Sequence, residues 1–440
     1  AANRRRVDVI RPTDVNPFFD LYLEDVRNLQ DSVLVPTLAT DLSGESRIFE
    51  QQPIEFAAFV QDKLEFGNNL VVKAGLRFEY YDTRERYIVN TRAQSEVIGS
   101  DENLEDADPK TYLSPRIGIS FPISESGAFR VAYGHFTQMP AYSRLYQNPI
   151  DANTTTLQLE GRTIGNPNLI PERTIKYEVG LQQQISDFIG IDVNLFYKNI
   201  RNLLGVQVLA TQDGINYFQT VNRDYGLVKG GTISFFTNPK GYLNAAGFDI
   251  TYQDAQSSSS NPNAIADVLI AGRRGEEPDV VVDRNIIPLD WDQPLTANAY
   301  LVFGKPNNWN VSFIHQLATG QPFTPVFLDE NKDFPENFFD NSENKPTLIT
   351  LDLSAEKQFN IRTTDVTFRV QVNNVLNYLN ERTVDSVSGR ADQIVRIPEA
   401  QSVRNQVNEV VGLFTNEQDD NRPTWYSAPR EILFSIQFNF

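Results

Sequence analysis

The sequence predicts an all-β protein, namely a transmembrane antiparallel β-barrel, and three observations lead to this fold class. Many segments alternate strictly between apolar and polar residues, which is the pattern of a strand with one apolar and one polar face. The connections between these segments alternate between tight turns and long polar loops. The composition is rich in strand and turn residues, with 29 Phe, 17 Tyr, 24 Gly and 24 Pro among 440 residues.

The alternation predicts about 14 strands along the chain. Segments such as DVTFRVQVN and LITLDLSAE show the period of two, in which every second residue is apolar. This repetition and the composition favour one large sheet over two or three soluble domains. The predicted strands lie near residues 3–10, 52–66, 69–82, 112–122, 127–138, 174–187, 189–201, 225–238, 242–255, 289–304, 309–320, 347–360, 364–378 and 429–440.

The last segment, REILFSIQFNF, carries the clearest alternation. In a soluble protein a terminal strand this apolar would promote aggregation through its free edge. We therefore expect apolar surroundings on one face of this strand and pairing partners on both of its edges. The apolar set consists of Ile432, Phe434, Ile436, Phe438 and Phe440.

The lengths of the connections predict how the strands are arranged. Tight turns are expected at residues 66–69, 123–127, 186–188, 238–241, 305–308 and 360–363, with long loops rich in Asn, Asp, Ser, Gly and Pro between them. Alternating lengths place all strands across one slab, with a plain end and an elaborate end. Transmembrane barrels have this arrangement, with short periplasmic turns and long extracellular loops. A soluble β-sandwich or a secreted solenoid is the alternative, but neither requires loops sorted by length.

Charged residues fit a sheet that has lipid on one side and a polar lumen on the other. Arg130, Lys198, Glu356 and Arg369 all fall on the polar faces of their strands. A basic residue that faced lipid near the bilayer midplane would cost about 2–4 kcal/mol. His315 is the exception, because it falls on the apolar face of its strand. Either that strand contains a bulge or a neutral imidazole faces lipid.

The composition and the motifs disfavour several classes of function. The formal net charge is -18, which argues against binding nucleic acid through bulk charge. The chain has no cysteine, so thiolate catalysis and Cys-based zinc sites are excluded. Neither a G-x-S-x-G elbow nor a G-x-x-x-x-G-K phosphate loop occurs, and His135 and His315 lie in separate predicted strands. We therefore expect ligand binding rather than catalysis, so the chain is not expected to be an enzyme.

Aromatic residues in the long loops are the candidate ligand-binding residues, because their rings can grip a ligand that arrives from outside. Packing of the loops on themselves is the alternative for each of them. The candidates are Tyr142, Tyr146, Phe334, Phe338, Phe339 and Trp425.

One acidic stretch is a weak candidate for calcium. DENKD places Asp329, Asn331 and Asp333 at the first three spacings of a calcium-binding loop. Phe334 stands where that loop needs Gly, and Asp340 replaces its bidentate Glu. We therefore expect no resident metal or cofactor, and a solvated acidic loop accounts for the stretch.

Several longer stretches are distinctive when they are taken together: FAAFVQDKLEFGNNLVVKAGLRFEYYD (56–82), YLSPRIGISFPIS (112–124), YGHFTQMP (133–140), GNPNLIPERTIKYEVGLQ (165–182), FYKNIRNLLG (196–205), PLDWDQPLTANAYLVFG (288–304), TGQPFTPVF (319–327) and VNNVLN (372–377). In this order they resemble TonB-dependent outer-membrane receptors, especially the Bacteroidetes-type receptors related to the Oar proteins. The resemblance covers most of the chain from about residue 50.

The family implies a barrel of about 22 strands, a plug domain inside the lumen and a short TonB box ahead of the plug. This chain has only about 14 predicted strands. Nothing ahead of residue 50 resembles a plug or a TonB box. We therefore interpret residues 1–440 as the carboxy-terminal portion of an outer-membrane barrel, without its plug domain. A complete barrel of about 14 strands is the alternative.

The resemblance also implies a location in the outer membrane and a function in active import of a scarce nutrient. The implied partners are outer-membrane lipid, the TonB complex acting through the missing plug region and, as in related uptake complexes, a surface lipoprotein. The aromatic terminal strand resembles the signal that the barrel-assembly machinery recognises. A passive pore for hydrophobic solutes and a structural barrel that binds a partner at the cell surface are the alternatives. An iron chelate, a peptide and a glycan fit the loops equally well as substrate.

Overall fold

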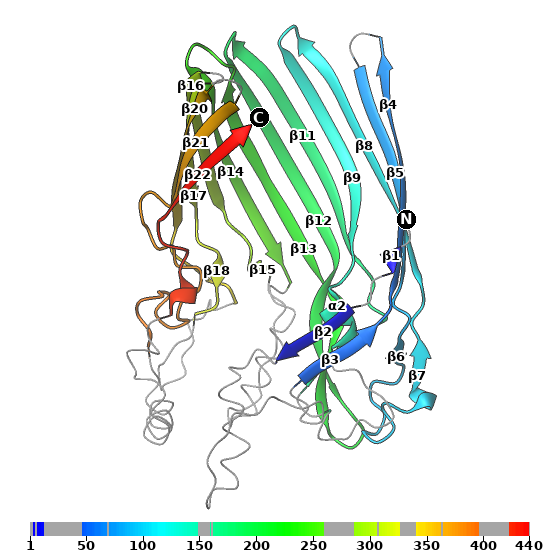
Figure 1. Cartoon of the computed structure of the whole chain (residues 1–440). Coiled ribbons are helices and arrows are strands. Elements are labelled where there is room, and N and C mark those ends of the chain that lie inside the picture. The colour runs from blue at the N-terminus through cyan, green and yellow to red at the C-terminus, as the bar shows by residue number, and fades with distance from the viewer. Residues whose placement is uncertain are drawn as a thin grey trace, which may run out of the picture.

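Antiparallel strands dominate the computed structural model of the chain (Figure 1). The structure describes residues 3–4, 7–12, 46–67, 70–147, 159, 162–258, 286–305, 308–325, 340–361, 364–395 and 422–439. Within these residues, one 16-stranded sheet contains all the long strands, which confirms the predicted all-β fold class. No helix in the described part of the chain combines the length and the apolar character needed to cross a membrane.

The long strands lie in the sheet in the order of the sequence, each antiparallel to the next. They are β4 (Ile54–Phe66), β5 (Leu70–Asp82), β8 (Lys110–Ser124), β9 (Gly127–Gln138), β11 (Glu172–Ser186), β12 (Ile189–Ala210), β13 (Asn216–Thr237), β14 (Leu243–Ser257), β16 (Leu295–Lys305), β17 (Trp309–Ala318), β20 (Leu348–Ile361), β21 (Thr364–Asn373) and β22 (Glu431–Asn439). Three short strands complete the sheet: β1 (Asn3–Arg4) pairs with β4, β10 (Thr163–Ile164) with β13 and β15 (Ile287–Pro288) with β14. This up-and-down order is the one that the alternating connections predict.

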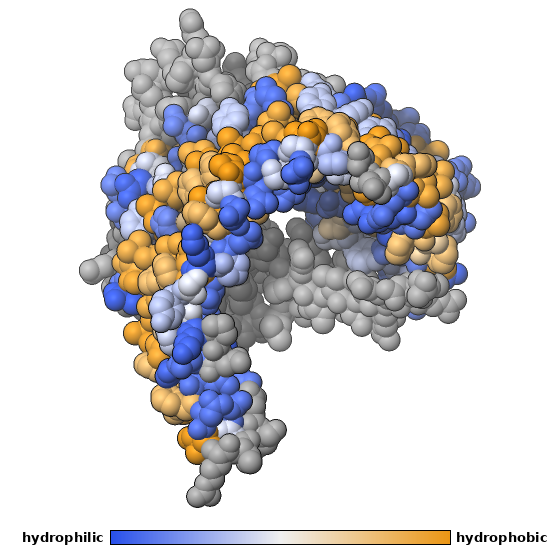
Figure 2. Space-filling view, turned by 90° about the horizontal axis from the view of Figure 1, so that it is seen from above, coloured by the Kyte–Doolittle hydropathy of each residue, from blue (hydrophilic) through white to orange (hydrophobic). Residues whose placement is uncertain are grey.

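The sheet is strongly curved but it does not close into a complete barrel. Among the described residues, no strand pairing joins β22 to β1 or β4. Seen along the strands, the sheet forms an arc around a hollow (Figure 2). Hydrophilic residues line much of the concave side and hydrophobic residues cover much of the convex side, which is the predicted division between lumen and lipid.

The two ends of the sheet differ in the way that the connection lengths predict. Tight turns join neighbouring strands at the upper end in Figure 1, here called the turn end, and longer segments gather at the opposite loop end. Gly67 and Gly241 in two of these turns have φ angles of +61° and +64°. Such left-handed angles favour glycine, which explains its place in both turns.

Apolar side chains that face one another across neighbouring strands build the convex face. Phe368 lies opposite Ile436, and Val370 lies opposite Phe434, so the four side chains share one face. The side chain of Phe434 is 77% exposed. Because exposed apolar area costs about 25 cal/mol per Å² in water, hydrocarbon is the solvent that suits this face.

Aromatic rings gather near both rims of the convex face. Towards the loop end, the rings of Tyr133, Tyr177 and Tyr197 follow one another across β9, β11 and β12, with centroid distances of 5.1 and 6.2 Å. Towards the turn end, the rings of Tyr242 and Trp309 stack with centroids 6.3 Å apart. Tyr and Trp concentrate at membrane–water interfaces, so these two groups fit interfacial girdles.

The structure decides between the two explanations for His315. β17 pairs with β16 and β20 without a register shift, so this strand contains no bulge. His315 lies opposite Ala299 and Leu351 on the convex face. Its Nδ1 is 2.9 Å from the backbone oxygen of Thr350, which can only accept, so the N–H at Nδ1 donates the hydrogen bond there.

The predicted strand at residues 3–10 is wrong as a single strand. Only β1 belongs to the large sheet, whereas β2 (Val7–Pro12) pairs with β3 (Ser46–Gln51) in a separate two-stranded sheet at the loop end (Figure 1). Alternation identifies an extended segment but carries no information about its pairing partner.

Some strand boundaries also differ from the prediction. β12 and β13 extend beyond the predicted 189–201 and 225–238 and stay paired as far as Ala210 and Asn216. A register shift around Asn202, whose φ is 62°, interrupts the period of two, and the alternation in the sequence ends at that point. β21 ends before 378 because Asn374 turns the chain with a φ of 52°.

Candidate functional site

The loop end of the sheet carries a folded cap. It consists of the segment 83–109, the described part of the segment 139–171 and the tip of the β12–β13 hairpin. In the first segment, β6 (Arg86–Ile88) pairs with β7 (Leu104–Asp106), and in the second, β10 runs parallel to β13. The apolar core of the cap contains Ile88, Ile98, Leu104, Leu159, Ile164, Leu209 and Tyr217. Because all three segments contribute to this core, the cap has a defined shape on which a ligand-binding surface can be built.

Hydrogen bonds connect the cap segments to one another. The hydroxyl of Tyr217 donates to the backbone oxygen of Thr91 at 2.5 Å. Ile170 and Asn222 form a reciprocal pair, because the backbone amide of Ile170 donates to Oδ1 of Asn222 at 2.9 Å and Nδ2 of Asn222 donates back to the Ile170 oxygen at 2.8 Å. The motif GNPNLIPE therefore attaches its loop to β13.

The concave wall below the cap is polar and internally paired. Arg130 contacts Asp192 at 2.6 Å, and Arg369 contacts Glu356 at 2.9 Å. The sequence places Arg130, Arg369 and Glu356 on the lumen side, and the structure confirms this. Ion pairs that are open to water contribute little to stability, about 0–1 kcal/mol each. Their main effect is to give the lumen a fixed pattern of charge.

Glycines on the wall leave room for aromatic rings from the next strand. A Cβ atom on Gly190 would lie 2.4 Å from the ring of Phe236, and one on Gly247 would lie 2.4 Å from the ring of Tyr300. Both ring residues lie on neighbouring strands directly opposite the glycine. The rings of Phe236 and Tyr300 therefore pack against the glycine backbone and stay close to the wall.

A groove crosses the wall on β5, β8 and β9. Its lining includes the glycines Gly75, Gly118 and Gly134, and its volume is about 370 Å³. Cationic side chains border it, among them Arg116, whose guanidinium carbon is 4.4 Å from the centroid of the Phe136 ring. Sequence reasoning missed this groove because its residues come from separate strands and meet only through the register of the sheet.

Tyr142 and Tyr146, two of the predicted ligand-binding residues, lie in the short helix α2 (Tyr142–Tyr146) of the cap. Tyr146 is 2% exposed, and its hydroxyl donates to the backbone oxygen of Thr83 at 2.9 Å. Burial raises the pKa of this phenol. The ring of Tyr142 stacks on Tyr146, and its hydroxyl donates to Glu55 at 2.6 Å. Tyr146 packs within the cap and Tyr142 is half-buried, and a ligand contact by either residue stays a prediction.

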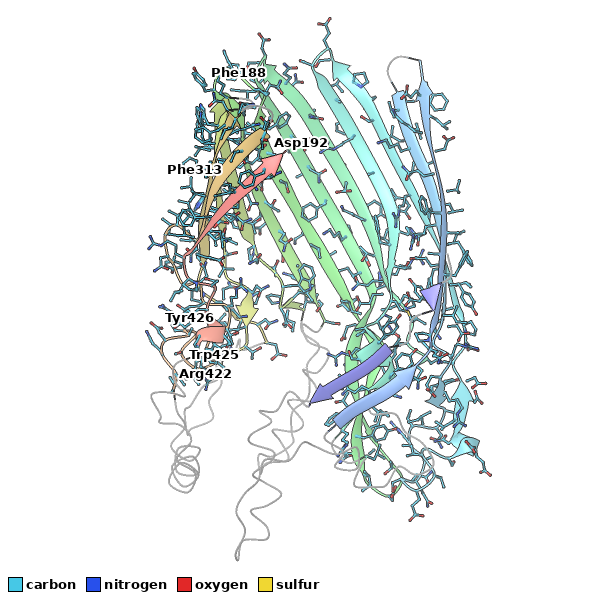
Figure 3. All side chains as sticks on the ribbon, in the orientation of Figure 1. Phe188, Asp192, Phe313, Arg422, Trp425 and Tyr426 are labelled. Carbon is cyan, nitrogen blue, oxygen red and sulfur yellow. The ribbon has the colours of Figure 1, made fainter. Side chains whose placement is uncertain are left out.

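Trp425 lies elsewhere at the loop end, in the 3₁₀ turn η3 (Pro423–Trp425) before β22. Figure 3 shows Arg422, Trp425 and Tyr426 together there. The guanidinium carbon of Arg422 is 4.4 Å from the centroid of the Trp425 ring. The backbone oxygen of Trp425 accepts a hydrogen bond from the amide of Arg382 at 2.7 Å. The ring is half-buried, so it retains surface that a ligand can contact.

The remaining predicted candidates lie outside the described residues. They are the aromatic residues Phe334, Phe338 and Phe339 and the weak calcium candidates Asp329, Asn331 and Asp333. In the part of the chain that the structure describes, no three His, Asp or Glu side chains come together in a group that could hold a metal ion.

The motif VNNVLN proves to be a structural connection. The backbone amide of Asn374 donates to Asp352 at 2.7 Å. Its Nδ2 donates to the backbone oxygens of Tyr378 at 3.0 Å and Ala428 at 3.1 Å. Asn374 is 7% exposed and has a left-handed φ of 52°. It therefore ties the end of β21 to the segment that leads into β22.

The apolar convex face, the polar concave face and the division into turn end and loop end together define an outer-membrane β-barrel. A comparison with protein families matches residues 37–375 to the family described as TonB dependent receptor-like, beta-barrel. The chain belongs to this family, whose members are barrels of the outer membrane. The turn end is therefore periplasmic and the cap is extracellular. The narrower resemblance to Oar-like receptors stays a prediction.

Solved structures with a similar fold include the copper transporter OprC, with a TM-score of 0.51 and 12% identity over 88% of this chain and 50% of that one. The ferric-catecholate import receptor Fiu from E. coli K12 has a TM-score of 0.47 and 16% identity over 82% of this chain and 45% of that one. The chain thus spans about half the length of these proteins. A search of curated protein sequences gave no match.

Proposed function

We propose that the protein imports a scarce nutrient across the outer membrane and that this chain forms the carboxy-terminal portion of its barrel. In this proposal, a preceding region supplies the remaining strands, the plug domain and the TonB box. The supporting observation is a folded extracellular cap next to a concave wall that is polar and ion-paired. The convex face of the same sheet is apolar and suits lipid. Family membership supports the dependence on TonB.

The import mechanism has two parts in this proposal. The extracellular cap and the neighbouring loops bind the substrate from dilute solution. TonB, driven by the proton gradient of the inner membrane, then moves the plug so that the substrate passes along the polar wall. The chain contributes binding surface and path rather than covalent chemistry, so the protein acts as a transporter and not as an enzyme.

The test is energised uptake by cells that produce the full-length protein. Cells with and without the protein are incubated in spent growth medium, and mass spectrometry identifies compounds that only the producing cells remove. We expect at least one such compound, and we expect a protonophore to abolish its removal because TonB needs the proton gradient. Uptake that persists with the protonophore, or no protein-dependent uptake at all, contradicts the proposal.

A passive pore is the competing function, and the hydrophilic lining of the hollow is the observation that favours it (Figure 2). Single-channel recordings of the full-length protein in a planar bilayer separate the two functions. An importer with its plug in place is expected to stay closed, whereas a diffusion pore conducts steadily without an energy source. Steady conductance in the absence of any substrate would favour the pore.

A further inference from the structure

The groove in the concave wall collects positive charge in a chain that is strongly acidic overall, with a formal net charge of -18. Six cationic residues lie on the concave side of β4, β5, β8, β11 and β12 in this region. They are Lys63, Lys73, Arg77, Arg116, Lys176 and Lys198. Such a local excess of one charge creates a positive potential within a wall of low dielectric constant.

The strand register brings these cations together. Gly75 lies opposite Arg116, Arg116 opposite Gly134, and Gly134 opposite Lys176. One pleat further along, Lys63 lies opposite Lys73 and Lys73 opposite Gly118. Because residues directly opposite one another share a face of the sheet, the long cationic side chains alternate with glycines that leave space beside them.

Half of these cations have no carboxylate partner. Lys63 pairs with Glu65, Arg77 with Glu79 at 2.9 Å and Lys176 with Glu178 at 2.7 Å. No described carboxylate lies within ion-pair distance of the other cations, which are Lys73, Arg116 and Lys198. Among the described residues, the side chains of Lys73 and Arg116 are exposed on the concave face, so no described group covers their charges.

Aromatic rings accompany the unpaired charges. Arg116 lies over the ring of Phe136, and Phe59, another lining residue, is 74% exposed. The groove therefore offers cationic groups for anionic substituents and ring faces for a flat apolar body. Its volume of about 370 Å³ suits a small organic molecule rather than a folded segment of protein.

We infer that this groove is a binding site for a small organic anion, one that joins carboxylate, sulfonate or phosphate groups to a flat apolar body, on the path along the wall. As a statement about the transported substrate, the inference rests on the proposed import function. The binding itself depends only on the groove.

The test measures binding of pyranine, a pyrene that carries three sulfonates, to the full-length protein in detergent by fluorescence anisotropy. Replacing the unpaired cations in K73Q/R116Q is expected to weaken binding by at least about tenfold, because the variant loses two charge-assisted contacts. R369Q is the matched control, because it removes a cation from the opposite part of the wall, and its affinity is expected to stay within about twofold.

A third variant fills the space within the groove without changing the charge of its lining. A Cβ atom on Gly118 would meet only the backbone oxygen of Val131, at 4.0 Å, so Gly118→Leu fits the strand and fills the groove. We expect this variant also to lose pyranine binding. Full affinity in either K73Q/R116Q or Gly118→Leu overturns the inference, and so does an equal loss in R369Q. Absence of binding to the unchanged protein, as when another part of the protein covers the groove, overturns it as well.

The failure of this inference and the failure of the import proposal give different results. If pyranine binds selectively but energised uptake does not occur, the groove is an anion site in a protein that is not an importer. If energised uptake occurs but all three variants bind pyranine as tightly as the unchanged protein does, the protein is an importer whose substrate does not use this groove.

Discussion

Asp213, at the tip of the β12–β13 hairpin, accepts hydrogen bonds from both the hydroxyl and the backbone amide of Ser95, which lies 118 residues earlier in the chain. The contact fastens the segment 83–109 to the hairpin. The Ser95 hydroxyl, then the hydroxyl of Thr211 and the Ser95 amide, lower the pKa of Asp213 to about 2. The hydrogen bonds thus favour the charged carboxylate.

This contact predicts that the cap loosens in acid. The unfolded pKa of Asp is about 3.9, and the folded value is lower, so the contact stabilises the cap fully above pH 4 and loses its effect as the pH falls towards 2. The protection factors of residues 83–109 against hydrogen exchange, which correct for the intrinsic effect of pH on the exchange rate, should fall over this range, and D213N should remove that fall. D187N, in a turn at the periplasmic end, is the control. The same acid-induced fall in protection in D213N as in the unchanged protein contradicts the role of Asp213.

The core of the cap predicts a second result. Ile98 is 0% exposed, whereas its neighbour Val97 is 45% exposed. Ile98→Ala should destabilise the cap by about 2–5 kcal/mol because it leaves a cavity, and Val97→Ala should have little effect. Limited proteolysis of the protein in detergent measures the difference as faster cleavage within the cap. Equal cleavage rates for the two variants would mean that the loops do not form a packed unit.

Asn374 predicts a third result, which concerns the connection between β21 and β22. Asn374→Ala loses the side-chain hydrogen bonds and the tolerance of a left-handed φ, so it should cost about 1–3 kcal/mol. Asn374→Gly restores the tolerance alone and should recover part of that loss. Urea unfolding in phospholipid vesicles measures both variants. If Asn374→Ala unfolds at the same urea concentration as the unchanged protein, the connection is not important for stability.

Much of the fold follows from the sequence because a strand between lipid and lumen must alternate in polarity. The faces of Arg130, Glu356 and Phe434 are all confirmed for that reason. The extension of β12 and β13 does not follow, since the register shift at Asn202 breaks the alternation while the pairing continues. Local periodicity reports the solvent on each face, and it carries no information about which strand is the neighbour.

The site follows from the sequence to a much smaller extent. The aromatic content of the loops predicts Tyr146 as a ligand contact, but the pattern does not show that its hydroxyl and ring also pack within the cap. The groove does not follow from the sequence, because Lys73, Arg116 and Lys176 are each ordinary lumen-facing cations there. They become a site only when the register places them side by side.

A fourth prediction concerns the lipid-facing surface and compares two adjacent residues whose side chains lie on opposite faces of the sheet. Leu195 is 58% exposed on the convex face, and Asn194 lies opposite Gly180 on the concave face. Leu195→Arg should destabilise the protein in vesicles by about 2–4 kcal/mol, because it places a charge in hydrocarbon. Asn194→Arg, within reach of the wall carboxylates Glu178 and Asp192, should be tolerated. Similar urea midpoints for the two variants contradict this orientation.

The central claim is that hydrocarbon covers the convex face of the sheet and that water covers its concave face. Because the chain has no cysteine, single cysteines at Phe434 and at Ser435 can each carry a nitroxide spin label. Electron paramagnetic resonance in vesicles then measures how oxygen, which dissolves in lipid, and a water-soluble nickel complex relax each label. The account predicts strong relaxation by oxygen at position 434 and by nickel at position 435. Equal relaxation by nickel at both positions would contradict it.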